Sequence, residues 1–518
     1  ASLVGSEMCI RDRDKMKKRI LAFLMCMILV LSASACANSG ADGEPKITAD
    51  GNVQAQVIEG VLKADVPDGE YISDITVDSQ RIWLTDGQYT LESCTDKTEI
   101  EITSVKREET AAQKAESVIF SIYDSDTNSY SVTWRTEIAD YPVVKLSSKS
   151  SPDEKTVSAY CDKCDTGYVN RAVFYNLDYD MEYTYTIYNS SGDKLYTDTF
   201  KTGNKIPETV TFMHVSDTQD EDYNGKVWAK LMDNAYSNTK SLDFILHTGD
   251  MVQYGGKEEL WSQMIGNVQS YVSSVPLMLT SGNHSYWSDY LDGASDIEYN
   301  HTTVNLPKQD TENGQYYSFD YGDIHFVVLS SGDSESSGVG YSQRKWLEKD
   351  LASTDKTWKI VAIHNPLYST GKYGSDKDRN KVARSQQKKL GKIFNEYGVD
   401  LVLQGHDHVF CLTPPMDENR NVVKCETKTE KGNGFDTTYY VNPQAPVYLM
   451  SGAGGSQNRE AFEEYEESWF SKAMDVPDNT AGYSIVTISG KKLTATYYQY
   501  DYANNTGGVS YSWGIEKE

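Results

Sequence analysis

The stretch VTFMHVSDTQ at residues 210–219 shows the pattern that decides the fold of most of this chain. Its apolar run, Val210–Val215, ends directly before the polar residues Ser216-Asp217-Thr218-Gln219. A short apolar run that stops at polar residues is typical of a buried strand. Because α/β folds bind ligands at the carboxyl ends of their strands, Asp217 and Gln219 are candidate site residues.

Four more polar clusters follow apolar runs in the same way. These clusters are Gly249-Asp250, Gly282-Asn283-His284, Ile363-His364-Asn365-Pro366 and Gly405-His406-Asp407-His408. Segments with a helical spacing of apolar residues, such as 226–239 and 383–395, alternate with the strands. This alternation predicts an α/β domain over residues 205–518. The last strands, at 483–488 and 493–500, are expected to complete a second sheet.

The side chains in these clusters are typical of a metal site. The candidate ligands among them are two carboxylates, one asparagine amide and three imidazoles, and Gln219 is a possible further ligand or a group that contacts a metal-bound water. Such ligands suit Zn, Mn or Fe. Four of the eight histidines of the chain lie in the clusters, which favours a functional role for them as a group.

The part of the chain before residue 205 predicts β modules. Residues 113–204 contain short alternating runs separated by turn residues, a pattern typical of a β-sandwich. Trp134 lies where such a sandwich buries an aromatic side chain. Residues 37–112 are expected to form a polar tether followed by a smaller β unit.

The first residues indicate export. Residues 16–19 are basic, Ile20–Leu31 is an apolar run too short to span a bilayer comfortably, and small residues follow before Cys36. Residues 16–36 are therefore interpreted as a signal peptide. Residues 1–15 fit no part of such a signal and resemble a non-native leader, with Met16 as the start.

Cys36 indicates how the exported chain is held. Its place directly after Ala33-Ser34-Ala35 resembles a bacterial lipoprotein cleavage site, at which the cysteine is lipidated. This predicts a protein anchored to the cell membrane by lipid, on the extracellular face. Secretion after cleavage behind Ala35 is the alternative.

The charge of the chain excludes one class of partner. The formal net charge is -27, and it becomes -30 (43 minus 73) without residues 1–36, which hold six Lys or Arg and three Asp or Glu. Such a surface repels phosphate backbones, so no nucleic-acid partner is expected. An anionic substrate would need a local positive centre, which bound metal could supply.

The other histidines and two cysteines are expected to be structural. Three histidines lie inside apolar runs, where hydrogen-bonded interior positions are expected: His214, His247 and His325. His301 is predicted at the surface. Cys411 and Cys425 could close a loop as a disulfide.

The order and spacing of the five clusters resemble the calcineurin-like metallophosphoesterase superfamily. With the β-sandwich in front, which resembles a fibronectin type III domain, the most similar branch is the purple acid phosphatase-like group. The resemblance covers roughly residues 113–500. It implies a multidomain chain in which a fibronectin III-like sandwich precedes a four-layer α/β/β/α phosphoesterase domain.

The resemblance also implies a role for each cluster residue. Asp250 would bridge two divalent or mixed-valence metal ions, and His284 would face the phosphate as the catalytic group. The ligands of one ion would be completed by Asp217 and His408, and those of the other by Asn283, His364 and His406. Two such ions can clamp a phosphate ester and lower the pKa of bound water.

The chain departs from the family pattern at two positions of the site. Many members have Asp-x-His in the first cluster, where this chain has Asp217-Thr218-Gln219. Purple acid phosphatases place a tyrosine three residues after the bridging aspartate, and this chain has Gln253 there. A tyrosinate–iron(III) site is therefore not expected, and the enzyme should be colourless.

These observations predict metal-dependent hydrolysis of a phosphate monoester outside the membrane, by attack of a metal-activated hydroxide. Phosphodiester or nucleotide hydrolysis on the same fold is the alternative within the enzymes. The alternative of another class is a cell-surface binding protein that has kept the fold without catalysis. Protein partners cannot be read from the residues.

Overall fold

The fold is described from a computed structural model of the chain. The described residues are 45–49, 53–58, 60–65, 70–78, 80–81, 89–91, 95–106, 114–138, 140, 142–150, 155–164, 167–220, 225–286, 301–306, 316–331, 338–371, 381–432, 434–457 and 469–518. The predicted signal peptide and Cys36 lie outside them. Within the described residues, no helix is long and apolar enough to cross a bilayer.

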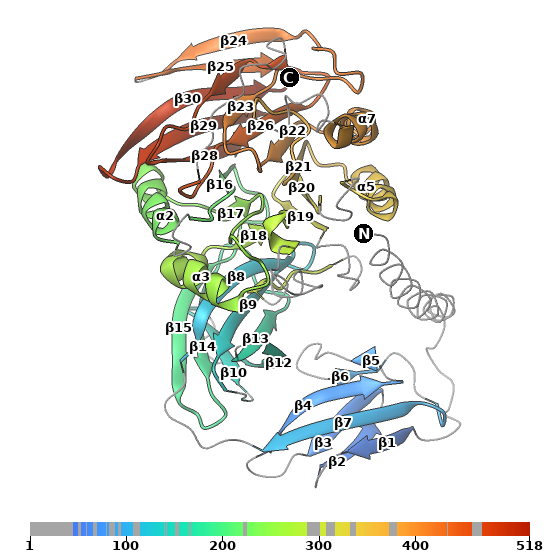
Figure 1. The fold of residues 1–518 in the computed structure, drawn as a ribbon. Helices are drawn as coiled ribbons and strands as arrows, with labels where there is room; N and C mark the ends of the chain where they lie inside the picture. The colour runs from blue at the N-terminus through green and yellow to red at the C-terminus, as the bar shows by residue number, and fades with distance from the viewer. Residues whose placement is uncertain are drawn as a thin grey trace, which may run out of the picture.

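The N-terminal unit consists of two small sheets (Figure 1). One has the strand order β1-β7-β4-β5 and the other β2-β3-β6. The strands are β1 (Lys46–Ala49), β2 (Gln54–Ile58), β3 (Val61–Asp65), β4 (Glu70–Val77), β5 (Gln80–Arg81), β6 (Tyr89–Thr90) and β7 (Glu99–Lys106). Alternate apolar side chains such as Leu62, Ile100 and Ile102 form its own small core. A separate β unit at this place was predicted from the sequence.

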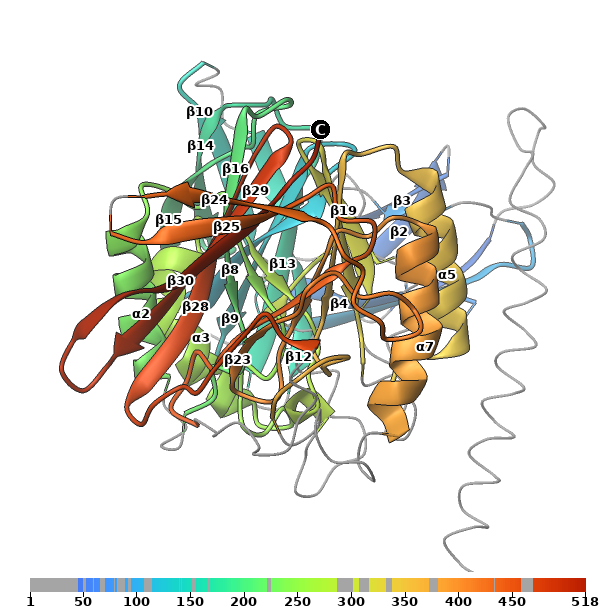
Figure 2. The same cartoon turned by 90° about the horizontal axis from the view of Figure 1, so that it is seen from above.

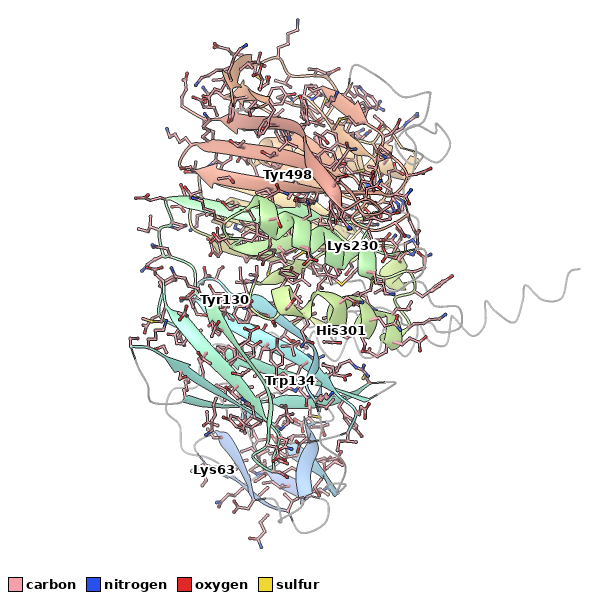
Figure 3. The ribbon with its side chains drawn as sticks, turned by 90° about the vertical axis from the view of Figure 1, so that its left-hand side faces the viewer. Lys63, Tyr130, Trp134, Lys230, His301 and Tyr498 are labelled. Atoms are coloured by element: carbon pink, nitrogen blue, oxygen red, sulfur yellow. The ribbon has the colours of Figure 1, made fainter. Side chains whose placement is uncertain are left out.

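The second unit pairs two four-stranded sheets. Their strand orders are β11-β10-β14-β15 and β12-β13-β9-β8. The strands are β8 (Glu116–Asp124), β9 (Ser129–Thr136), β10 (Val143–Ser148), β11 (Lys155–Ser158), β12 (Tyr160–Cys164), β13 (Gly167–Phe174), β14 (Glu182–Tyr188) and β15 (Lys194–Lys201). Trp134 is fully buried among aromatic side chains of this unit, as the sequence predicted (Figure 3). The fibronectin type III assignment stays a prediction.

The third unit contains two large sheets. The first has eight strands in the order β18-β17-β16-β28-β29-β30-β25-β24, and the second has seven in the order β19-β20-β21-β22-β26-β23-β27. The strands are β16 (Thr209–Val215), β17 (Phe244–His247), β18 (Leu277–Leu279), β19 (Tyr317–Tyr321), β20 (Ile324–Leu329), β21 (Trp358–Ile363), β22 (Leu401–Gln404), β23 (Phe410–Leu412), β24 (Glu426–Lys431), β25 (Asp436–Val441), β26 (Val447–Ser451), β27 (Lys472–Met474), β28 (Thr480–Ser489), β29 (Lys492–Asp501) and β30 (Thr506–Glu516).

Helices pack against the two large sheets from different sides (Figure 2). Apolar side chains of α2 (Lys226–Asn238) and α3 (Glu258–Val272) share a core with β16–β18. Those of α5 (Tyr341–Ser353) and α7 (Lys381–Glu396) share a core with β20–β22. Between the sheets lies a third core that contains Phe212, Phe244 and Phe326. The central strands β17, β18, β20, β22 and β26 are buried on both faces, which explains their continuous apolar runs.

The C-terminal strands correct one prediction. They were expected to complete a second sheet, but β28 pairs antiparallel with β16, so β28, β29 and β30 extend the sheet that opens the domain. The pairing joins Thr209 to Ser489. Alternation of apolar residues shows that a segment is a strand but not which strand it pairs with.

The second and third units are joined by a buried charged cluster, which also corrects the prediction for His301. Arg135 of β9 lies 3.0 Å from Glu258 of α3, and His301 lies 3.0 Å from the same carboxylate. The His301 ring, labelled in Figure 3, stacks on that of Trp261 with 5.4 Å between ring centroids. His301 was predicted at the surface, but it is 1% exposed because these distant partners enclose it.

Replacing Glu258 by Ala is expected to destabilise the protein by about 3–5 kcal/mol, because it leaves the Arg135 charge buried without its partner. Chemical denaturation followed by tryptophan fluorescence measures the change. Glu182→Ala is the matched control, since the Lys149–Glu182 pair of the second unit is exposed and should matter little. Equal denaturant concentrations at the unfolding midpoint for the two variants would contradict the prediction.

Candidate metal centre

Both large sheets contribute to the candidate site. Asp217, Asp250 and the Asn283-His284 pair follow β16, β17 and β18 of the first sheet. In the second sheet, His364 follows β21, and His406 and His408 follow β22. These strands are parallel within each sheet, so their carboxyl ends lie at one edge. The residues predicted as ligands are therefore brought together from the two sheets.

Four ligand-type atoms converge on one point beside His364. Its Nε2 lies 3.0 Å from Asp250 Oδ2, 3.1 Å from Asn283 Oδ1 and 3.2 Å from His406 Nδ1. Ligand atoms about 2.0–2.1 Å from a tetrahedral ion lie about 3.3 Å from one another, which is close to these separations. Ligand atoms of Asp250, His364 and His406 all lie within 4.8 Å of one another. This group therefore fits a divalent metal ion.

A second pair lies beside the first group. His408 Nε2 is 3.4 Å from Asp217 Oδ1, and both side chains are buried. Within the described residues, neither of these two atoms has a hydrogen-bond partner. Buried polar atoms are normally satisfied, so two facing orphan atoms of ligand type fit a metal ion between or beside them. Asp217 also accepts the backbone N–H of His406, at 2.8 Å, which attaches it to the first group.

Gln219 has the same kind of orphan atoms. Its side chain is 1% exposed, and neither its amide oxygen nor its amide nitrogen has a hydrogen-bond partner among the described residues. Its burial agrees with the prediction of a residue at the site. Direct ligation by Gln219 stays a prediction.

The backbone of the site adopts an uncommon conformation. Asp217, Asp250, His406 and His408 have φ values of 54°, 54°, 79° and 59°. Residues other than glycine rarely adopt this left-handed backbone conformation, and those that do cluster at functional sites. The turn at each strand end directs the side chain toward the shared edge.

Glycines allow the loops to approach one another. A Cβ on Gly282 would lie 2.1 Å from Asp250 Oδ1 and 2.5 Å from the backbone nitrogen of Asp250. A Cβ on Gly405 would lie 2.0 Å from Ser216 Oγ. The glycines that precede the ligand residues are thus required by packing.

Backbone carbonyls orient two of the ligand histidines. His364 Nδ1 donates to the carbonyl of Thr248 at 2.7 Å, and His408 Nδ1 donates to the carbonyl of Gln457. Each bond leaves Nε2 as the atom that points to the site, as is usual for metal-binding histidines. These supporting residues could not be predicted from the sequence, because a backbone acceptor leaves no side-chain signal.

His284 lies beside the group but not within it. Its backbone N–H donates to Asp250 Oδ1 at 2.8 Å, and its Nδ1 donates to the carbonyl of Gln253 at 2.8 Å. Its Nε2 lies 3.7 Å from Asp250 Oδ2, farther than the corresponding His364 atom. His284 therefore lies at the border of the group, with its Nε2 on the side of Asp250.

Charge within the site shifts several pKa values. Burial alone would raise the pKa values of Asp217 and Asp250. For Asp217, the neighbouring His408 and His364 outweigh burial and lower the pKa. For Asp250, His364 and His284 outweigh burial and lower the pKa. Burial opposes protonation of His364, but Asp250 outweighs it and raises the pKa of His364 to about 9. Burial and the His364 charge lower the pKa of His406 to about 3.

Two other histidines support the loops from behind. His214 bonds Ser451 and Thr248, and His247 bonds Thr218, all between 2.8 and 3.0 Å. Both are completely buried, and burial lowers their pKa values to about 3 and about 4. These positions confirm the predicted hydrogen-bonded interior role.

Elsewhere, the structure corrects the cysteine prediction and shows a separate cavity. Cys411 and Cys425 are free thiols, so they do not close a loop.

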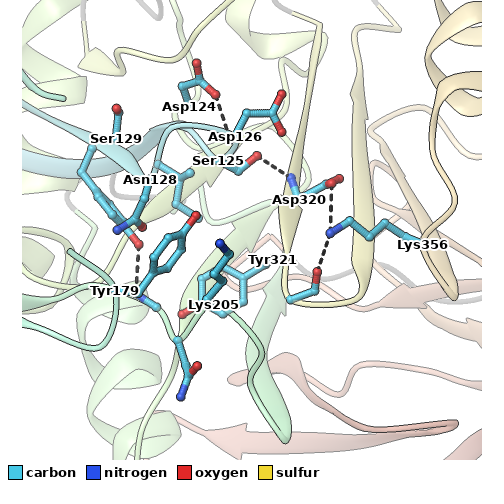
Figure 4. Close-up of a pocket in the computed structure, with 15 residues that line it drawn as sticks. Asp124, Ser125, Asp126, Asn128, Ser129, Tyr179, Lys205, Asp320, Tyr321 and Lys356 are labelled. Atoms are coloured by element: carbon cyan, nitrogen blue, oxygen red, sulfur yellow. Dashed lines mark hydrogen bonds and ion pairs between the residues drawn. The ribbon is translucent and has the colours of Figure 1, made fainter. Parts of the chain in front are cut away.

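A cavity of about 200 Å³ lies between the second and third units, and its lining includes Asp320 and Lys356 (Figure 4). None of the candidate ligands lines it, so it is not part of the metal centre.

The family comparison identifies the segment that carries this site. The model for calcineurin-like phosphoesterases matches residues 210–410. This segment is similar to the calcineurin-like phosphoesterases. It contains all of the candidate ligands and His284.

Relatives of the chain include acid phosphatases. Probable inactive purple acid phosphatase 1 of Arabidopsis thaliana is 24% identical over 330 residues, 59% of this chain and 52% of that protein. Acid phosphatase type 7 of Danio rerio is 23% identical over 377 residues, 67% of this chain and 75% of that protein. The chain thus spans about half the length of the first of these relatives.

A solved structure agrees with the fold. Purple acid phosphatase PPD1 from yellow lupin seeds superposes with a TM-score of 0.64 at 19% identity, over 82% of this chain and 78% of that one. The third unit therefore has a metallophosphoesterase fold, preceded by a mostly β region. The matching family model is that of phosphoesterases, and the relatives carry the names of purple acid phosphatase and acid phosphatase.

Metal binding at pH 7 is expected to release about one proton, because His364 is protonated below its pKa of about 9 and must lose this proton to become a ligand. Affinity should therefore fall as the pH falls below about 9. Calorimetric titration with Zn²⁺ in buffers of different ionisation enthalpy counts the protons. His364→Asn is the control and should release fewer; a heat that does not depend on the buffer would contradict the prediction.

Gly282→Ala is expected to abolish or strongly weaken metal binding while the protein stays folded, because the new Cβ collides with Asp250. Metal content after dialysis and circular dichroism measure the two properties. Gly266→Ala on α3 is the matched control, since its Cβ would meet nothing within 4 Å. Normal metal content in Gly282→Ala would refute the packing argument.

Proposed function

We propose that the chain is a phosphomonoesterase with two metal ions at the site described above. The convergence of Asp250, Asn283 and two histidines on one point, beside the orphan Asp217–His408 pair, carries the proposal. One ion would be held by Asp250, Asn283, His364 and His406. The other would be held by Asp217 and His408, with Asp250 shared and Gln219 as a possible additional ligand.

The two ions, when bound, would neutralise phosphate charge and lower the pKa of a water molecule. The residues themselves position the reactants. Neutral asparagine and histidine ligands leave the centre positive, since only two carboxylates face four positive charges. This local charge would let a chain with a net charge of -27 bind an anion.

His284 would act on the leaving group. Its Nδ1–H is held by the carbonyl of Gln253, so Nε2 is the atom that faces the site. A proton on Nε2 would pass to the leaving oxygen of the ester as the P–O bond breaks, or would stabilise the charge there. The bond between its backbone N–H and Asp250 fixes the ring beside the metal centre.

The location of the activity is part of the proposal. The basic and apolar residues before Cys36 support export, and the small residues beside Cys36 support a lipid anchor. The β-sandwich in front of the phosphoesterase domain supports the fibronectin type III-like assignment. The substrate would then be a small phosphate ester outside the membrane.

The test is turnover of nitrophenyl phosphate and bis-nitrophenyl phosphate by residues 37–518 loaded with Zn, Mn or Fe. Metal-dependent turnover with a preference for the monoester is expected. Asp250→Asn should abolish it, and His284→Ala should lower kcat by about 10²–10⁴-fold with metal bound. Asp436→Asn, at an exposed position, is the matched control.

The outcomes separate the alternatives. A preference for the diester would replace the monoester proposal by a phosphodiesterase. Two bound ions without turnover of either ester would refute the proposed substrate class, and the absence of bound metal would favour a binding protein.

A further inference from the structure

We propose that Gln253 and Gln457 form a positioning link that fixes the rings of His284 and His408 relative to each other. The link deepens the proposed function, on which it rests, because it joins the group that would act on the leaving oxygen to a ligand of one metal ion. Gln253 occupies the position where purple acid phosphatases have a metal-binding tyrosine. In this chain the side chain there has a different partner.

Three hydrogen bonds make the link continuous. His284 Nδ1 donates to the carbonyl oxygen of Gln253 at 2.8 Å. The side-chain nitrogen Nε2 of Gln457 donates to Oε1 of Gln253 at 2.6 Å. His408 Nδ1 donates to the carbonyl oxygen of Gln457. Each histidine is therefore held by the backbone of one glutamine, and the two glutamines are held together by their side chains.

The link connects loops from the two sheets. Gln253 lies between β17 and α3, in the loop that contains Asp250, whereas Gln457 lies beyond β26 of the second sheet. The near end of the Gln457 loop is already attached, because the N–H groups of Gly454 and Gly455 donate to the carbonyls of Ser216 and Asp217. The Gln253–Gln457 bond is a further attachment, two residues after Gly455.

Orientation of both rings matters for the chemistry. Nε2 of His408 must face Asp217, which lies 3.4 Å away, and Nε2 of His284 must face the substrate. A histidine whose Nδ1–H has a fixed acceptor keeps one tautomer and one ring plane. If the acceptor moves, the ring turns with it, so movement at one glutamine would reach both histidines.

A pair of amides suits this place. Amides do not titrate, so the link would not change with pH and would add no charge beside the metal centre. An acid–base pair of the same length would add charges that compete with the ligands. A neutral link can thus fix the two histidine rings without changing the charge beside the metal centre.

The test uses the mature chain with Gln253→Leu, Gln457→Leu and the double variant. Each single change is expected to weaken the binding of one of two Mn²⁺ or Zn²⁺ ions by about tenfold in calorimetry, as for other groups that orient ligands. The other ion should be unaffected. The double variant should be no worse than either single variant, because all three break the same bond.

The second readout is the dependence on the leaving group. If His284 loses its orientation, kcat should fall more for phenyl phosphate than for nitrophenyl phosphate, because the poorer leaving group needs the proton more. A general loss of stability would lower both equally. Gln263→Leu, on the exposed side of α3, is the control for an ordinary glutamine change.

Glutamate variants provide a matched comparison. Gln253→Glu and Gln457→Glu bring the same charge to nearly the same place, since the bonded atoms are 2.6 Å apart. Gln253→Glu keeps an acceptor for Gln457, whereas Gln457→Glu replaces the donor by a second acceptor. Gln253→Glu should therefore retain most of the metal affinity, and Gln457→Glu should resemble the leucine variants.

The outcomes distinguish the link from the proposed function. If the unchanged protein turns over no phosphate ester, the function fails, but the metal affinities of the variants still test the link. Leucine variants with unchanged metal affinity and unchanged leaving-group dependence would overturn the link. Equal metal affinities for the two glutamate variants would overturn it as well, because charge and not the hydrogen bond would then decide.

Discussion

The buried contact between Asp250 and His364 is the constraint on which the rest of the site depends. It joins the first sheet to the second, because Asp250 follows β17 and His364 follows β21. A buried charge is tolerated only with a partner. In the metal-free protein, Asp250 pairs with protonated His364. A bound cation would replace the proton of His364 as the positive partner of Asp250. The two sheets therefore meet where a positive charge is required.

The loops around this contact are held tightly. Left-handed backbone at four ligand positions, together with glycines that leave no room for a Cβ, fixes the side chains before any ion binds. Such strain persists only where the surroundings determine it. Here the surroundings are two fully buried histidines, His214 and His247, and the strands on either side. The site is thus built into the packing of the domain.

Much of this arrangement could be predicted from the sequence. Polar residues after apolar runs identified Asp250 and His364, because the carboxyl ends of parallel strands share an edge. Contacts between distant segments could not be predicted: the burial of His301 depends on Glu258 and Trp261, about 40 residues earlier. Backbone acceptors such as Thr248 were also invisible, since any residue type can supply a carbonyl.

The pairing of β16 with β28 has a consequence for how the protein assembles. β16 carries Asp217 at its end, and its partner strand lies about 280 residues later, from Ser489 back to Thr480. Contacts between residues so far apart in the sequence form late in folding. Until the later strand arrives, one edge of β16 is open to pairing with other chains. The ligand residues after β16 therefore reach their final packing only after residues 484–489 have joined the sheet.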